Sequence, residues 1–242
     1  KISLVSNIIK KNKSDYLFIS APENVSWLLN IRGSDVPFSP IINCNCLVGK
    51  NKKILLIGKM NKFKNLLKKR LISKNQIIDP KNLIDTFKNL KGKNFIIDEK
   101  TCSVFNERLI TKKFNIKTRE DPCYLLKAKK NSAEISNMIK SHVEDGIALT
   151  KFIFWMKNNK PENLTELDAE KMLERFRKQS KSYLYPSFNT IAGSGPNGAI
   201  VHYRAKKKTN RKIKSQDIFL CDSGGQYKYG TTDVTRTMCF SK

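Results

Sequence analysis

Short apolar runs alternate with helical patterns over the first half of the chain. Residues 16–20, 54–57 and 95–97 are mostly apolar runs of strand length, whereas residues 2–9, 63–67 and 83–87 carry apolar positions at helical spacing. Buried strands produce the first pattern and amphipathic helices the second. Their regular alternation predicts an α/β domain that ends near Pro122.

The second half has a different order of patterns, with long helices before strands. Asn131 and Glu134 form a capping pair at the start of one long helix, and Thr165 and Asp168 begin a second helix. Strands are then expected at residues 187–191, 199–202, 218–222 and 233–240. Two helices followed by an antiparallel sheet predict an α+β arrangement.

The apolar positions of these two helices predict their buried faces. The first helix repeats apolar residues at helical spacing on one face, which is therefore expected to face the core, with His142 on it as a satisfied core histidine. That face consists of Ile135, Met138, Ile139, His142, Val143 and Ile147. The second helix is expected to bury Leu167, Leu173 and Phe176.

Composition and charge narrow the function classes. The 242 residues are 39% hydrophobic, which favours a folded core, and the net charge is +26. The lysines are spread along the chain without a nucleic-acid recognition motif, so we expect no specific nucleic-acid partner and only weak, non-specific affinity for polyanions at low salt. No apolar run has the length of a membrane span and no signal peptide is evident, which predicts a cytoplasmic protein without a membrane partner. The six cysteines lack zinc-binding spacing and are expected to be free, buried thiols.

Candidate chemistry is concentrated in the stretch from Asp222 to Thr237. Asp222 and Asp233 stand eleven positions apart, with glycines and short β-forming runs between and beside them. This pattern predicts a β-hairpin with its turn at residues 227–230, which brings the two aspartates close together. Two neighbouring carboxylates cannot both remain ionised cheaply unless a cation lies between them, so the pattern indicates a divalent-metal site.

Four segments resemble the aminopeptidase P (Xaa-Pro aminopeptidase) family of the creatinase, or pita-bread, fold. The hairpin DSGGQYKYGTTDVTRT resembles the family's metal hairpin, and PSFNTIAGSGPNGAIVHY resembles the segment in which His202 matches an active-site histidine. The segments WLLNIRGSD and LKAKKNSAE are similar to the family's second-domain signature and to the start of its catalytic domain. The resemblance implies a creatinase-like α/β domain at residues 1–124, followed at residues 125–242 by the first half of an α+β pita-bread domain.

The resemblance also implies a reaction. Two divalent ions, expected to be Mn²⁺ with Zn²⁺ or Co²⁺ as alternatives, would activate a hydroxide that releases the N-terminal residue from peptides with proline at the second position. By carry-over from the family, Asp222 binds one metal ion, Asp233 bridges both, and His202 contacts the substrate and stabilises the intermediate. Arg236 and Thr235 are expected to support the metal-binding carboxylates, and family members are often dimers, so a homodimer is expected.

One departure from the family pattern bears on activity. The family completes its metal site with a histidine and two glutamates beyond the hairpin, and these are missing from the 242 residues. The chain as given is therefore expected to be an inactive internal fragment. Two alternatives stay open at this point: a non-catalytic pita-bread protein that acts as a binding or scaffold module, and a prolidase that acts on Xaa-Pro dipeptides.

Overall fold

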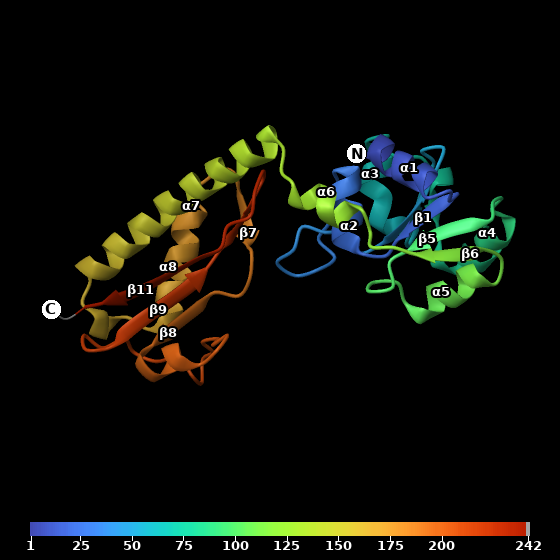
Figure 1. Cartoon of the computed structure of the whole chain (residues 1–242). Coiled ribbons are helices and arrows are strands. Elements are labelled where there is room, and N and C mark those ends of the chain that lie inside the picture. The colour runs from blue at the N-terminus through green and yellow to red at the C-terminus, as the bar shows by residue number, and fades with distance from the viewer. Residues whose placement is uncertain (241–242) are drawn as a thin grey trace. The chain divides into compact units, whose positions relative to one another are not determined.

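The structure, a computed structural model, describes residues 1–240 and divides into two compact units (Figure 1). The first unit contains residues 1–36 and 40–129, and the second contains residues 37–39 and the chain from residue 130 onward. Each unit has its own hydrophobic core.

A six-stranded mixed sheet with the order β4-β3-β2-β1-β5-β6 forms the centre of the first unit. β1 pairs antiparallel with β2 and parallel with β5, so the chain crosses over between them. A turn at residues 49–53 joins β2 to β3, and in it the backbone N–H of Gly49 donates to the carbonyl of Lys53 at 2.8 Å. The strands are β1 (Tyr16–Ile19), β2 (Asn45–Gly49), β3 (Ile54–Ile57), β4 (Ile77–Ile78), β5 (Asn94–Ile97) and β6 (Asn115–Thr118).

Helices cover both faces of this sheet, which explains why its strands are apolar on both sides. In β1, Leu17 and Ile19 face the core beneath α1, α2 and α3, whereas Phe18 faces the core beneath α4 and α5. The α/β prediction for this half is confirmed. The helices are α1 (Ile2–Lys11), α2 (Pro22–Leu29), α3 (Lys64–Lys68), α4 (Leu83–Asn89), α5 (Val104–Thr111) and α6 (Cys123–Ala128).

The second unit packs two helices, α7 (Ser132–Asn158) and α8 (Glu166–Arg177), against an antiparallel sheet with the order β11-β9-β8 (Figure 1). This sheet consists of β8 (Ile191–Ser194), β9 (Ile218–Ser223) and β11 (Val234–Cys239), while β7 (Tyr183–Pro186) pairs with β10 (Gly225–Tyr227). Both predicted capping boxes are present, at Asn131 and Thr165. The α+β prediction for this half is confirmed.

The predicted buried face of α7 is wrong. Ile139 and Val143 expose 61% and 58% of their surface, and His142 is exposed, with Nδ1 2.9 Å from the Met138 carbonyl. The face that packs inward carries polar residues as well as apolar ones, and these polar residues have buried partners in the same unit. Hydropathy alone therefore misidentifies the face. The residues that α7 buries are Ser141, Asp145, Ala148, Leu149, Phe152 and Met156.

Two strand predictions before the hairpin are also wrong. No strand covers residues 187–190; instead β7 ends at Pro186 and β8 begins at Ile191. Residues 195–199 form a 3₁₀ helix rather than leading into a strand at residues 199–202. The chain folds back on itself here and brings Gly193 close to Gly198. A Cβ on Gly193 would lie only 2.8 Å from the Cα of Gly198. The apolar residues that follow are exposed, with Val201 at 81%.

Two further findings concern the described part of the chain. None of its helices has both the length and the apolar character needed to cross a bilayer. Its six cysteines are free thiols; Cys44 and Cys46 lie in one core as expected, but Cys239 is exposed, contrary to the prediction.

Candidate metal centre

The hairpin formed by β9, β10 and β11 carries the two predicted metal ligands. Its turn is where the sequence predicts it, since the Tyr227 N–H donates to the Gly230 carbonyl at 2.8 Å. Asp222 pairs with Thr235 across the β9–β11 ladder. Further along, the Thr232 N–H donates to the Gly225 carbonyl at 2.9 Å, so the same register continues towards the turn.

Asp222 lies on the central strand of the three-stranded sheet, between Thr235 on β11 and Ile191 on β8. Its Oδ1 atom is buried and has no hydrogen-bond partner in the structure as described. A buried carboxylate oxygen without a partner carries an uncompensated desolvation cost, which a bound cation would remove. This unpartnered oxygen is the observation that best fits a metal ligand.

Asp233 is exposed and directly precedes β11. The hairpin register places it opposite Gly224, two positions from the residue that faces Asp222. Residues at such diagonal positions have Cα atoms about 7–8 Å apart. The hairpin therefore brings the two aspartates to neighbouring positions, although not directly opposite each other. The strands can approach each other closely here because Gly224 has no side chain: a Cβ at this position would lie only 2.0 Å from the Thr232 carbonyl oxygen.

His202 lies in an exposed turn rather than at the end of a strand, and its φ of 54° is in the left-handed region. This conformation is uncommon for residues other than glycine. The flanking structure fixes the turn, because Tyr203 is buried and the Tyr203 N–H donates to the Ile200 carbonyl at 3.1 Å.

A buried carboxylate holds the segment that carries His202. Glu166, which is 0% exposed, accepts hydrogen bonds from the Ser194 N–H at 2.8 Å and from the Tyr203 hydroxyl at 2.8 Å. It also accepts from the Asn197 amide at 3.0 Å and from the Arg211 N–H at 3.1 Å. Glu166 thus ties together both ends of the loop between β8 and the residue after His202.

A second buried hydrogen-bond network joins the hairpin to α7 and α8. Arg177 donates to both carboxylate oxygens of Asp145, at 2.7 and 3.2 Å, and to the hydroxyl of Ser223 at 3.0 Å. The Tyr227 hydroxyl donates to Asp145 at 2.8 Å. Burial acts to lower the pKa of Arg177, but the hydrogen bond and charge of Asp145 outweigh it and raise that pKa. The residue next to Asp222 and the start of the hairpin turn are therefore fixed to α7 and α8.

Other residues near the aspartates contribute less to the site. Burial raises the pKa of the Cys221 thiol to about 12, so this thiol stays protonated near neutral pH. Arg236 pairs with Cys221, which places it on the face opposite to Asp222, and its guanidinium donates to the Thr235 carbonyl at 2.8 Å. Support of the carboxylates by Arg236 and Thr235 stays a prediction.

The donor set matches the chemistry of a hard divalent cation in part. Carboxylate oxygens are the ligands that Mn²⁺ prefers, and the unpartnered Oδ1 of Asp222 needs a positive partner. Within residues 1–240, however, no three His, Cys, Asp or Glu side chains gather closely enough to hold a metal ion, so His202 does not join the aspartates in such a cluster. The described residues thus offer part of a metal site.

Sequence reasoning missed the buried charges that organise this site. Glu166, Asp145 and Arg177 belong to helices whose other residues read as ordinary amphipathic positions. The available signal was local: Glu166 directly follows a predicted N-cap, and Asp145 stands at helical spacing from the apolar residues Leu149, Phe152 and Met156. Neither signal identifies the partner, because the partners are 28 to 82 residues away in sequence.

Comparisons with known proteins agree with the fold of both units. Residues 1–134 match the family of the creatinase/prolidase N-terminal domain, and residues 136–242 match metallopeptidase family M24. The Xaa-Pro aminopeptidase ApepP of Drosophila melanogaster is 36% identical over the whole chain, and the chain covers 40% of that protein. Xaa-Pro aminopeptidase 1 of Dictyostelium discoideum is 33% identical over the whole chain, which covers 39% of it.

Solved structures with the same fold include an X-prolyl aminopeptidase from Caenorhabditis elegans, described as a cytosolic enzyme with a di-nuclear active site. It has a TM-score of 0.84 and 25% identity, and the match covers the whole of this chain and 41% of that one. The prolidase of Pyrococcus horikoshii has a TM-score of 0.74 at 20% identity, covering the whole of this chain and 65% of its own. The chain thus spans about two fifths of the length of the curated relatives it matches.

Proposed function

The chain belongs to the creatinase/prolidase N-terminal domain family and continues into an M24 metallopeptidase domain, and from this premise we propose that the whole protein is a metal-dependent aminopeptidase. It would release the N-terminal residue from peptides with proline at the second position. The observation that carries the proposal is the buried, unpartnered Oδ1 of Asp222 on a hairpin that holds Asp233 at a neighbouring position. Relatives named Xaa-Pro aminopeptidases support the substrate class.

Asp222 and Asp233 are the residues of this chain that would hold the metal ions, which we propose to be Mn²⁺. Divalent ions supply a nucleophile near neutral pH by lowering the pKa of water. Asp222 is half-buried and its Oδ1 atom is buried, so the attraction of that oxygen for a cation is stronger than it would be in open solvent.

His202 would act on the substrate rather than on the metal. Its imidazole is exposed and so can reach a peptide, and a ring nitrogen can donate a proton to charge that develops on the scissile carbonyl oxygen. Glu166 and Tyr203 would position His202, because they hold the backbone on either side of it.

Location and assembly follow as proposals from the same relationship. We place the protein in the cytoplasm because the C. elegans neighbour is described as a cytosolic enzyme. A homodimer and the absence of a specific nucleic-acid partner are likewise proposed, the latter because the sequence carries no recognition motif for nucleic acid.

The test is peptide hydrolysis by the complete protein. With Mn²⁺, it should cleave a tripeptide such as Ala-Pro-Ala after the first residue, and a chelator should abolish the activity. Asp233→Asn should remove turnover, whereas the matched exchange Asp85→Asn, at an exposed residue of α4, should leave it unchanged. Cleavage of Ala-Pro dipeptide alone would instead identify a prolidase, and no cleavage with Mn²⁺, Zn²⁺ or Co²⁺ would overturn the enzyme proposal.

A further inference from the structure

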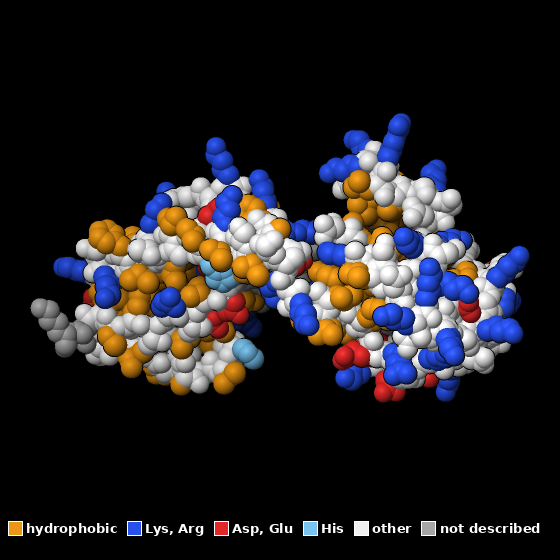
Figure 2. All heavy atoms as spheres, turned by 45° about the horizontal axis from the view of Figure 1, so that its top comes forward, with side chains coloured by type: hydrophobic (Ala, Val, Ile, Leu, Met, Phe, Trp, Pro, Cys, Tyr) orange, Lys and Arg blue, Asp and Glu red, His pale blue; other side chains and the backbone are white. Residues whose placement is uncertain are grey.

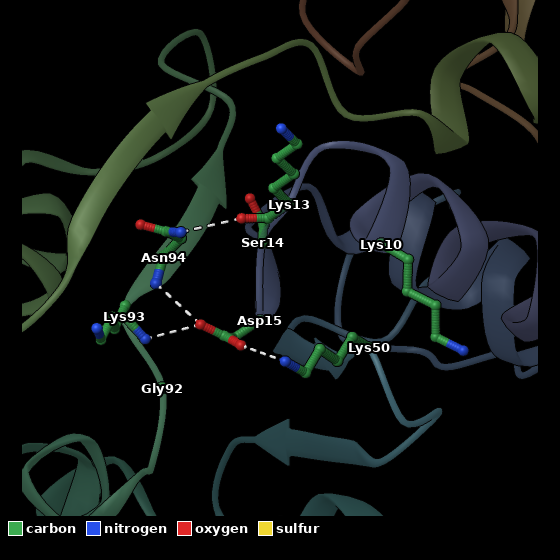
Figure 3. Close-up of a pocket in the computed structure, with 8 residues that line it drawn as sticks. All are labelled: Lys10, Lys13, Ser14, Asp15, Lys50, Gly92, Lys93 and Asn94. Atoms are coloured by element: carbon green, nitrogen blue, oxygen red, sulfur yellow. Dashed lines mark hydrogen bonds and ion pairs between the residues drawn. The ribbon is translucent and has the colours of Figure 1, made fainter.

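A basic hollow of about 540 Å³ lies in the first unit, remote in sequence from the hairpin (Figure 3). Its walls come from three segments: the end of α1 with the turn into β1, the turn after β2, and the loop before β5. Four lysines and one aspartate line it, so the lining carries a net charge of +3.

Asp15 fixes the backbone of this hollow. Its carboxylate accepts hydrogen bonds from the Lys93 N–H at 2.7 Å, the Asn94 N–H at 3.0 Å and the Lys50 ammonium at 2.7 Å. The loop lies tightly against it, because a Cβ on Gly92 would come within 3.0 Å of the Asp15 side chain. One carboxylate thus joins the segments and is itself neutralised by Lys50.

The remaining lysines have no such partner. In Figure 3 no interaction joins the ammonium groups of Lys10, Lys13 or Lys93 to another lining residue, and none of the ion pairs in the described chain involves them. The C-terminal end of α1 offsets only about half a positive charge through its helix dipole. A surplus of more than two positive charges therefore remains at the hollow.

Two residues of the hollow, Lys13 and Gly92, have positive φ angles. Lys13 has a φ of 49°, and its carbonyl accepts hydrogen bonds from the Asn94 amide at 2.9 Å and from the Lys117 ammonium at 3.4 Å. Gly92 has a φ of 141°. The φ of Lys13 is the left-handed conformation that commonly follows the end of a helix, and glycine adopts a positive φ without steric cost, so hydrogen bonds rather than strain fix this backbone.

We propose that this hollow binds a small molecule bearing a chain of phosphates, such as inorganic tripolyphosphate or a nucleoside triphosphate. Its size is typical of small-ligand sites. In Figure 3 the ammonium groups of Lys10, Lys13 and Lys93 point in different directions, and their long, flexible side chains would turn towards a ligand to bind phosphate oxygens as point charges. Asp15 does not repel the ligand, because Lys50 and two backbone amides compensate its charge. The site is independent of the proposed hydrolysis.

The competing explanation is diffuse attraction to a chain with a net charge of +26, whose lysines are spread widely over the first unit (Figure 2). A matched pair of variants separates the two. The site variant exchanges Lys10, Lys13 and Lys93 for Gln. The control variant exchanges Lys64, Lys68 and Lys81, which are exposed lysines outside the hollow, for Gln. Both variants lose three positive charges.

Isothermal titration with inorganic tripolyphosphate at 0.15 M salt would be made on the chain and both variants, with circular dichroism to check folding. Each exposed pair of a lysine with a phosphate should contribute about a factor of two to three to the affinity. We therefore expect the dissociation constant of the site variant to rise about tenfold and that of the control variant to change less than twofold. Titration with ATP should show the same loss. Equal weakening in both variants, or no binding by the unchanged chain, would overturn the proposal. The single exchange Lys10→Glu should weaken binding in the same direction if the triple variant does not fold.

Discussion

Replacing Glu166 tests whether a buried carboxylate organises the loop that carries His202. Its two oxygens face only donors, from Ser194, Asn197, Tyr203 and Arg211. In Glu166→Ala all four donors lose this acceptor and some of them are buried, although the Tyr203 hydroxyl and the Asn197 amide can still donate to the Thr209 carbonyl. A lost buried partner costs about 1–3 kcal/mol, so we expect a total loss of roughly 3–5 kcal/mol of unfolding free energy after local relaxation.

Glu166→Gln separates the positioning role from this general destabilisation. The Gln amide has nearly the same shape, and its NH₂ group can donate to the Tyr203 hydroxyl, which can in turn donate to the Thr209 carbonyl at 3.0 Å. The N–H of Arg211 then loses its acceptor, at an expected cost of about 1–3 kcal/mol. The fold should persist while the loop shifts around His202.

The assay uses the fact that the chain has only two histidines, His142 and His202. Two-dimensional NMR of the imidazole C–H groups should show a shifted His202 signal in Glu166→Gln and an unchanged His142 signal, since His142 lies on an exposed face of α7. Urea unfolding gives the free energies, and Glu162→Gln, at a residue outside this network, serves as the matched control. An unchanged His202 signal together with a stability change below about 0.5 kcal/mol in Glu166→Gln would refute the reasoning.

Three further predictions concern stability and metal binding. Asp145→Ala should lower the free energy of unfolding by about 3–5 kcal/mol, because Arg177 is then a buried charge without its partner. In urea unfolding, the double variant Asp145→Ala with Arg177→Met should recover part of this loss. If the effects of the two substitutions were additive, the pairing would be contradicted. Burial acts to raise the pKa of Asp15, but hydrogen bonds from Lys50 and the backbone outweigh it and lower the pKa to about 2. The stabilisation by the Asp15 carboxylate is therefore complete above the unfolded pKa near 4 and is lost as the pH falls towards 2. In urea unfolding, the chain should be more stable than Asp15→Asn by about 1–2 kcal/mol above pH 4, and this difference should disappear towards pH 2. A difference that stays constant over this pH range would contradict the prediction. In the complete protein, Asp222→Asn should abolish the rise in melting temperature caused by Mn²⁺, as followed by calorimetry, and an undiminished rise would exclude Asp222 as a ligand.

Local features of the chain were determined by the sequence itself. The capping boxes at Asn131 and Thr165, the hairpin turn before Gly230 and three of the six strands of the first sheet depend on residues within a few positions of each other. The hairpin pattern also brought Asp222 and Asp233 to neighbouring positions, because its turn length sets the register. The family resemblance rests on four short segments, of which this hairpin is one.

Contacts between distant segments were decided only by the tertiary structure. The buried face of α7 carries Asp145, which is stable there because Arg177 lies opposite it, and no hydropathy pattern on α7 contains that information. The loop around His202 follows the carboxylate of Glu166 rather than its own apolar residues. The basic hollow needs three separate segments joined through Asp15. Burial and hydrogen bonding at each site depend on a partner far away in the chain, and only the folded structure supplies it.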